Sequence, residues 1–149
     1  MAVVLAINIS DKTGVIKHPV ASAEFISGGI MGDAHCGLSD IKQVSLLANE
    51  SVDKMRAMGL ELEAGAFAEN ITTEGIILNT LPIGTRLAIG ETIQEVSQIG
   101  KTCHHGCAIK QKTGTCVMPT EGIFTIVIKG GIVKPGDSIA VIMNNMIDR

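Results

Sequence analysis

One stretch of the chain, residues 100–119, gathers most of the side chains that could do covalent or metal chemistry. It contains three of the four cysteines, two of the four histidines and three lysines. Within it, Cys103 lies two residues after Lys101 and directly before His104. Nearby positive charge favours the ionised thiol, which is the form that acts as a nucleophile or a metal ligand. We therefore predict that Cys103 does the chemistry and that Lys101 and His104 keep its thiol ionised.

Two other kinds of cysteine site fit the spacing less well. A structural zinc site would use Cys103, His104, Cys107 and Cys116 as ligands. Zinc usually takes its ligands from two pairs of the C-x2-4-C type, and here Cys103 and Cys107 form one such pair while the second is incomplete. A redox pair of Cys103 and Cys107 would be spaced more widely than the usual C-x-x-C. Both alternatives stay open, whereas the surroundings of Cys116 are compatible with a buried, inert strand residue.

A second stretch, GGIMGDAHCG at residues 28–37, is dense in glycine and holds Asp33, His35 and Cys36. Glycine allows a backbone to approach a ligand closely, and it also allows positive φ in a plain connection. The first interpretation makes this a binding loop in which Asp33 or His35 orients a ligand. The second makes it a structural turn, and the sequence leaves both open.

Composition limits the class of protein. At 149 residues the chain has the size of one domain, and we expect a single domain over 1–149 with a core at about 3–142 and a polar tail at 143–149. No apolar run approaches the ~20 residues that cross a bilayer, and the first residues lack the features of a secretion signal. We therefore expect a cytoplasmic protein with no membrane partner, in which the cysteines stay reduced.

Charge and aromatic content argue against a nucleic-acid partner. The net charge is −3, and the chain has no Trp or Tyr and three Phe. A basic footprint and aromatic side chains that stack on bases are the usual signs of nucleic-acid binding. Neither is present in this sequence.

Short strands separated by glycine-rich turns are predicted along most of the chain. A helix is expected over 50–58, between a capping Asn49 and Gly59, and a short one over 104–112. Many short strands with few helices are typical of a barrel or a closed sandwich, so the fold is predicted to be mainly β. The expected strands cover 3–8, 15–17, 20–26, 43–47, 85–89, 92–98, 122–129 and 138–142.

Six segments together resemble the MOSC domain, named for the C-terminal domain of molybdenum cofactor sulfurases. They are GDAHCG, QVSLLA, GAFAENITTEGI, LPIGTRLAIGE, QIGKTCHHGCAI and GIFTIVIKGGIVKPGDSI. The resemblance runs from Val3 to Ile142 and keeps the order of the segments. It is strongest to the short bacterial branch of the family, which also occurs fused to molybdopterin-biosynthesis domains. It implies a mainly β fold, a closed β-barrel with a few short helices.

The resemblance also implies a role for one cysteine, which carries sulfur as a persulfide or binds the molybdenum of a bound molybdopterin cofactor. The family's cysteine has Gln five residues before it and a basic residue two before it, here Gln98 and Lys101. Cys103 is therefore the expected persulfide carrier or molybdenum ligand. The family segments thought to line the pocket match the 32–37 loop and the Glu69-Asn70 pair. The residues carried over as cofactor-binding are Gly32, Asp33, His35, Gly37 and Asn70, with backbone N–H groups of the 28–37 loop receiving the phosphate.

Several functions are compatible with this resemblance. The first is a sulfur carrier or a molybdenum-cofactor-binding protein that acts through Cys103. As a carrier it would be a sulfur transferase whose partner is a cysteine desulfurase. The alternatives are a molybdenum-cofactor-dependent reductase of N-hydroxylated compounds and a non-catalytic partner of a molybdopterin-biosynthesis enzyme.

Overall fold

The computed structural model describes residues 2–12, 15–100 and 121–143. The predicted catalytic residues Lys101, Cys103 and His104 lie outside these ranges, as does the helix expected over 104–112. The roles assigned to those residues therefore stay predictions. The same holds for the zinc and redox alternatives, whose ligands fall in the same segment.

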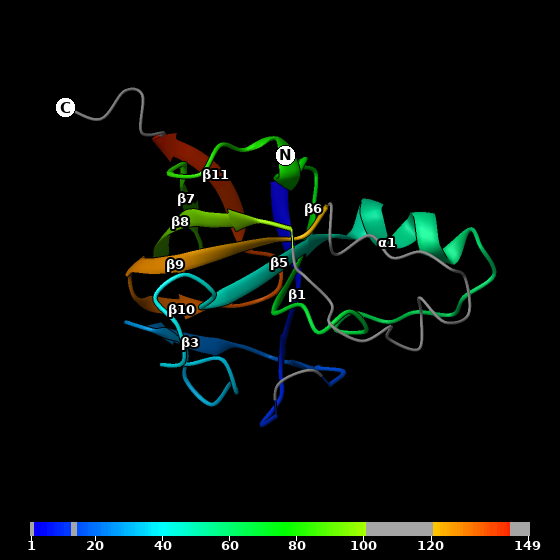
Figure 1. The fold of residues 1–149 in the computed structure, drawn as a ribbon, viewed down its shortest axis with the longest axis horizontal. Helices are drawn as coiled ribbons and strands as arrows, with labels where there is room; N and C mark the ends of the chain where they lie inside the picture. Colours follow the sequence, from blue (N-terminus) through cyan, green and yellow to red (C-terminus); the bar gives the residue numbers. More distant parts are fainter. Residues whose placement is uncertain (1, 13–14, 101–120, 144–149) are drawn as a thin grey trace.

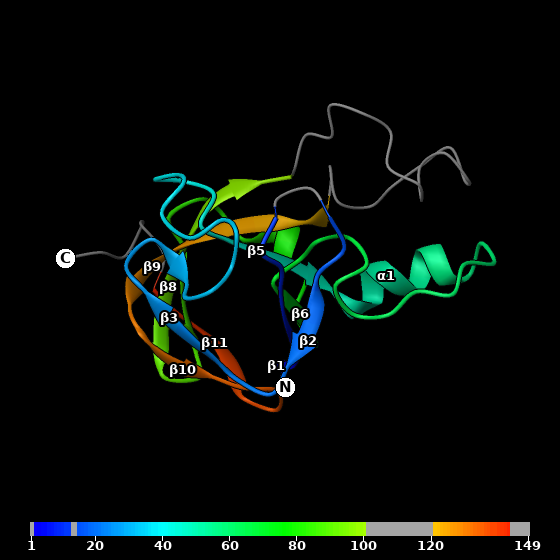
Figure 2. The ribbon, with the colours of Figure 1, turned by 90° about the horizontal axis from the view of Figure 1, so that it is seen from below.

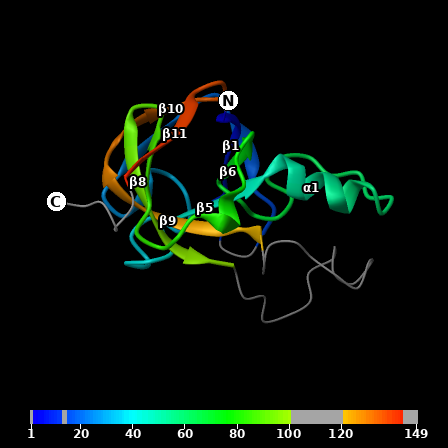
Figure 3. The same ribbon diagram turned by 90° about the horizontal axis from the view of Figure 1, so that it is seen from above.

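Seven strands form a closed ring, which confirms the predicted barrel (Figures 1 and 3). Neighbouring strands follow the order β11-β7-β8-β9-β5-β6-β1, and the pairing of Ala2 in β1 with Ile139 in β11 closes the circle. Within the ring β5 and β6 run parallel, and the other pairs are antiparallel. The ring strands are β1 (Ala2–Ile9), β5 (Val44–Ala48), β6 (Ile71–Glu74), β7 (Arg86–Ile89), β8 (Thr92–Ile99), β9 (Ile123–Lys129) and β11 (Ser138–Met143).

The remaining elements lie on the outside and at one end of the ring. β2 (His18–Val20) adds to the second half of β1, and a small sheet is made by β3 (Ala23–Ile26), β4 (Gly29–Ile30) and β10 (Gly131–Val133). Figure 2 shows β3 crossing the end of the barrel. Phe25, Ile30 and Val133 of the small sheet are buried in the same core as the ring strands, so this sheet covers that end.

The barrel core follows from strand register and β-branched residues. Ile7 lies opposite Ile71, Ile71 opposite Leu46, and Leu46 opposite Ile123, and all four side chains are fully buried. Such residues suit a pleated, buried surface, and burying each stabilises the fold by roughly 1.5–3 kcal/mol. This layer fixes the position of the polar residues that come next along each strand.

The N-terminal hairpin differs from its prediction. The expected partner of the first strand was 15–17, but β1 pairs with His18–Val20, and Asn8 lies opposite Pro19. Proline is tolerated there because β2 is the edge strand and needs no ladder donor on its outer side. The backbone N–H of Lys17 donates instead to the carbonyl of Gly65 (3.0 Å), which takes that residue out of the hairpin.

One α-helix, α1 (Asn49–Arg56), lies beside β5 and β6 outside the ring, and a 3₁₀ turn, η1, covers Leu78–Thr80 (Figure 1). The predicted helix is confirmed, although it begins one residue earlier and Asn49 does not cap it. The Asn49 amide oxygen instead accepts a hydrogen bond from Arg56 (2.8 Å). Val52 and Met55 pack into a small core with Leu47 and Phe67. No helix in the described ranges is long and apolar enough to cross a membrane.

Candidate functional site

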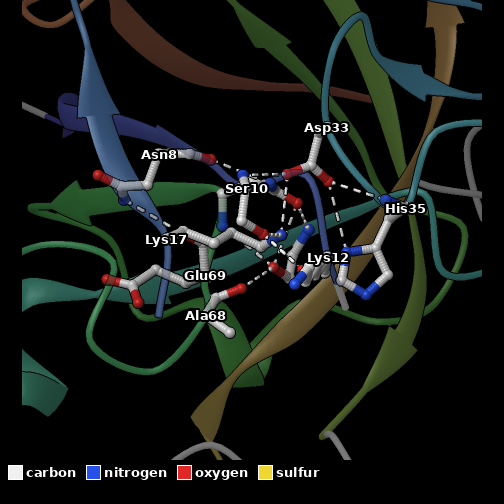
Figure 4. A network of polar contacts seen from close by, with 10 residues as sticks. Asn8, Ser10, Lys12, Lys17, Asp33, His35, Ala68 and Glu69 are labelled. Atoms are coloured by element: carbon white, nitrogen blue, oxygen red, sulfur yellow. Dashed lines mark hydrogen bonds and ion pairs between the residues drawn. The ribbon is translucent and has the colours of Figure 1, made fainter. Parts of the chain in front are cut away.

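A fully buried ion pair holds the loop that carries Asp33 and His35 (Figure 4). Lys17 Nζ lies 2.8 Å from Asp33 Oδ1, and the two side chains are 0 % and 1 % exposed. Lys17 Nζ also donates to the Ser10 hydroxyl (3.0 Å), and the backbone N–H of Ser10 donates to Asp33 Oδ1 (3.1 Å). One carboxylate therefore joins the end of β1, the residue before β2 and the 28–37 loop.

His35 lies against the second oxygen of the same carboxylate. Its backbone N–H donates to Asp33 Oδ2 (3.1 Å), and its buried Nδ1 lies 3.4 Å from that oxygen. Burial alone would raise the pKa of Asp33, but His35, Lys17 and the Ser10 N–H together hold that pKa well below its ordinary range. Asp33 is therefore ionised, and the His35 side chain, 16 % exposed, reaches the surface.

The backbone of the 28–37 loop does not fit the predicted role of phosphate receptor. Most of its N–H groups donate within the protein: those of Met31, Asp33, Ala34, His35, Cys36 and Gly37 are all taken. The ammonium of Lys17, which contacts this loop, is neutralised by Asp33. The loop therefore offers few free backbone donors to an anionic group.

The glycines of this loop serve its conformation. Gly32 and Gly37 have φ of +88° and +77°, which other residues rarely adopt, and a Cβ on Gly37 would meet nothing within 4 Å. Gly29 faces its own chain, because a Cβ there would lie 3.1 Å from the Gln43 carbonyl oxygen. The described structure thus gives these glycines a structural use, and cofactor contact at Gly32 and Gly37 stays a prediction.

Asn70 is fully buried at the start of β6, and its amide is used on both sides. Its Oδ1 accepts from the Ser45 backbone N–H (3.0 Å), and its Nδ2 donates to the Asn8 carbonyl (3.1 Å). These bonds tie β1 and β5 to the entry of β6. The described structure thus gives the Asn70 amide a structural use, because it bridges two strands. A contact of Asn70 with a cofactor stays a prediction.

Glu69 anchors the irregular segment before β6. Its carboxylate accepts from the backbone N–H groups of Gly65 (3.0 Å) and Phe67 (3.1 Å) and from the Thr72 hydroxyl (2.7 Å). Burial raises the pKa of Glu69 despite these donors. The turn it stabilises holds Ala68 at φ +61°, an unusual value for a residue with a side chain.

The described residues on either side of the cysteine-rich segment, Gly100 and Glu121, are held by hydrogen bonds. On one side, the Gly100 N–H donates to the Gly122 carbonyl (2.6 Å), and Gln98 Nε2 donates to the Gly100 carbonyl (3.0 Å). On the other, Glu121 accepts from the hydroxyl of Ser51 (2.6 Å) and from Lys54 (3.0 Å), both on α1. The barrel and α1 thus fix the two points between which residues 101–120 run.

Of the predicted site residues, the described structure places Asp33, His35 and Asn70 along one chain of polar contacts. Asp33 and His35 are adjacent, and the Lys17–Gly65 and Gly65–Glu69 bonds connect them to the segment that precedes β6, where Asn70 lies. Sequence reasoning missed Lys17, which follows two apolar residues and carries no motif, and it missed Glu121. In the described ranges no group of three or more His, Cys, Asp or Glu side chains is placed to hold a metal ion.

Comparison with known proteins identifies the family. Residues 33–140 match the model of the MOSC domain. Among solved structures, YuaD from Bacillus subtilis superposes with a TM-score of 0.78 at 20 % identity, covering 93 % of this chain and 94 % of that one. YiiM from Geobacillus stearothermophilus gives 0.73 at 21 %, over 96 % and 76 %, and YiiM from Escherichia coli gives 0.66 at 20 %, over 96 % and 70 %. No curated protein matches the sequence. Because the family model covers well over half of its length, the chain belongs to the MOSC domain family.

Proposed function

We propose that this protein binds the molybdenum cofactor and that the Cys103 thiolate is its protein ligand to molybdenum. The support is that the family match, 33–140, includes Cys103. A thiolate is a soft ligand, suited to a transition metal held by sulfur. When bound, the cofactor supplies a redox-active metal centre, and the chain supplies the ligand and its surroundings.

One structural observation carries this proposal, the hydrogen bonds that hold the end of β8 just before the cysteine segment. Cys103 follows the end of β8 by four residues, and the side chain of Gln98 holds the carbonyl of Gly100 at that end. A functional side chain close to a rigid strand is positioned more precisely than one in the middle of a long loop. The short spacing from β8 therefore favours a ligand that must be placed accurately.

The described residues restrict where the rest of the cofactor can lie. The 28–37 loop does not fit the phosphate, because its donors are used internally and Lys17 is paired with Asp33. The basic residues of the sequence that remain near the cysteine are Lys101, Lys110 and Lys112. We assign the phosphate of the cofactor to these lysine side chains rather than to the loop backbone.

We also propose that the protein is cytoplasmic, because its thiols would stay reduced there.

The persulfide carrier is the competing function. There the Cys103 thiolate attacks the outer sulfur of a desulfurase persulfide; a new S–S bond forms on Cys103, the donor's S–S bond breaks, and the donor leaves as a thiolate. Intact mass spectrometry after incubation with a cysteine desulfurase and cysteine separates the two functions. Wild type, Cys103→Ser and the control Cys107→Ser would be compared.

The ligand proposal predicts that wild type and both variants keep their mass. A gain of one sulfur, about 32 Da for the step from thiol to persulfide, in wild type and Cys107→Ser but not in Cys103→Ser would contradict it and establish the carrier. The reductase and the non-catalytic partner named from the sequence stay predictions, as does any partner enzyme.

A further inference from the structure

Asp33 and His35 are arranged like the orienting carboxylate and the base of an acid–base pair (Figure 4). Asp33 Oδ1 accepts from Lys17 Nζ (2.8 Å) and from the Ser10 N–H (3.1 Å), and Oδ2 accepts from the His35 backbone N–H (3.1 Å). A carboxylate can accept about four hydrogen bonds. Oδ2, which the His35 ring faces at 3.4 Å, therefore keeps capacity for a further donor.

The surroundings of the His35 ring decide which nitrogen carries its proton. Nδ1 is buried, has no hydrogen-bond partner within the described part of the chain, and lies 3.4 Å from Asp33 Oδ2. That distance is long for a hydrogen bond, yet an ionised carboxylate is an acceptor only, so a lone pair on Nδ1 would face another lone pair. The proton of the neutral ring therefore belongs on Nδ1, and Nε2 keeps its lone pair.

Nε2 is the ring nitrogen that is available to a ligand. Figure 4 shows it on the side of the ring turned away from Asp33, and the His35 side chain is 16 % exposed although Nδ1 is buried. A free histidine in water carries its proton mainly on Nε2, so the contact with Asp33 reverses the usual preference. A histidine that only supported the loop would need no exposed lone pair.

We propose that His35 is a proton-transfer residue, with Asp33 and Lys17 as its positioning residues. Nε2 accepts the proton of a small protic ligand, one whose reacting group is a hydroxyl, a thiol or an N–H, and the electron pair of that bond stays with the ligand atom. The imidazolium that forms lies against the Asp33 carboxylate, which stays ionised because Lys17 holds its other oxygen. Nε2 then returns the proton to an atom of the product.

This inference goes beyond the proposed function, because it assigns chemistry to the His35 imidazole whether or not a cofactor is bound. It adds an acid–base group to the proposed molybdenum ligand, and a protein that only stored the cofactor would not need one. The tautomer of His35 can be measured without molybdenum, so the two proposals can fail separately.

The tautomer is read from the nitrogen shifts of the imidazole rings in ¹⁵N-labelled, full-length protein. Spectra are recorded at about pH 8.5, roughly two units above the ordinary pKa of histidine, and the signals are assigned from His35→Gln and His18→Gln. Wild type should show His35 with its proton on Nδ1. His18, on the edge strand β2, is exposed and supplies the reference for a free ring.

Two variants separate this role from plain support of the loop. In Asp33→Asn the amide oxygen should stay where Lys17 and the Ser10 N–H donate, which turns the amide NH₂ toward Nδ1. The ring proton should then move to Nε2. Lys17→Met removes the ion pair but leaves the carboxylate facing Nδ1, so it should destabilise the loop and keep the proton on Nδ1.

Diethyl pyrocarbonate measures whether the Nε2 lone pair is available. Nε2 attacks a carbonyl carbon of the reagent, an N–C bond forms, and a C–O bond breaks to release ethyl carbonate, which takes up the ring proton and decomposes to ethanol and carbon dioxide. Peptide mapping after limited reaction locates the added group. His35 should react in wild type and in Lys17→Met, and at least about tenfold more slowly in Asp33→Asn, whose exposed nitrogen would carry the proton.

Wild-type protein with the His35 proton on Nε2, or with a His35 that does not react, overturns the proposal. So does movement of the proton to Nε2 in Lys17→Met, because support of the loop would then set the state of the ring. If Asp33→Asn does not fold, the spectra of wild type and Lys17→Met still decide. Protein that carries no molybdenum but has its His35 proton on Nδ1 contradicts the proposed function alone.

Discussion

Removing one partner of the buried Lys17–Asp33 pair should strongly destabilise the fold. Both side chains are at most 1 % exposed, so solvent does not screen the pair. Breaking a buried pair by removing one partner costs about 3–5 kcal/mol. Asp33→Asn leaves the Lys17 ammonium with no countercharge and should lie at the upper end of that range.

Lys17→Met should cost less, at the lower end. The Asp33 carboxylate then keeps the backbone N–H groups of Ser10 and His35 as donors. With a shift of about 2–4 °C per kcal/mol for a chain of this size, the single variants should melt roughly 6–20 °C below wild type. The double variant should lose at least about 2 kcal/mol less than the sum of the singles, because neither charge is then left alone.

Urea unfolding followed by circular dichroism measures these differences, since the chain has no Trp or Tyr for fluorescence. The three variants and wild type form a double-mutant cycle. If the two single costs add to within about 0.5 kcal/mol, Lys17 and Asp33 do not act as a pair and the reasoning is refuted.

Three further outcomes are expected. The pKa of Asp33 is lower in the folded than in the unfolded protein, so its contribution to the free energy of unfolding is present above about pH 4 and is lost as the pH falls below that value. The free energy of unfolding should therefore fall less steeply with acid in Asp33→Asn than in wild type. Equal slopes in the two proteins would refute this. Gly65→Ala should cost about 1–3 kcal/mol more than Gly59→Ala in urea unfolding. Both glycines have positive φ, but a Cβ on Gly65 would clash with the Lys17 carbonyl oxygen, whereas one on Gly59 would meet nothing within 4 Å. Equal costs would contradict the clash. Lys54→Ala should change the unfolding free energy by less than about 1 kcal/mol, because the Lys54 side chain is 64 % exposed; a larger loss would mean that Glu121 needs its ammonium.

The barrel could be predicted from the sequence because local signals agree with the fold. Strand residues alternate in β8, and a Gly90-Glu91 turn joins it to β7, as expected from the turn chemistry. The register of the N-terminal hairpin could not be predicted, since it depends on Lys17 being bound to Gly65 and Asp33, two partners far away in the sequence.

The candidate site was only partly accessible from the sequence, for a related reason. Motif matching found Asp33, His35 and Asn70, but a motif does not say whether a polar side chain faces a ligand or another strand. The hydrogen bonds of Asn70 to Ser45 and Asn8 link residues 25 and 62 positions apart. Glu121 carries no motif and gains its interest from its contact with α1.

The central claim is that Cys103 holds the molybdenum of a bound cofactor. Its most direct test is the molybdenum and pterin content of protein purified from a cofactor-producing host, for wild type, Cys103→Ser and Cys107→Ser. The account predicts equimolar molybdenum and pterin in wild type and Cys107→Ser, and loss of most of the molybdenum in Cys103→Ser. Equal molybdenum in all three proteins, or none in wild type, would contradict it.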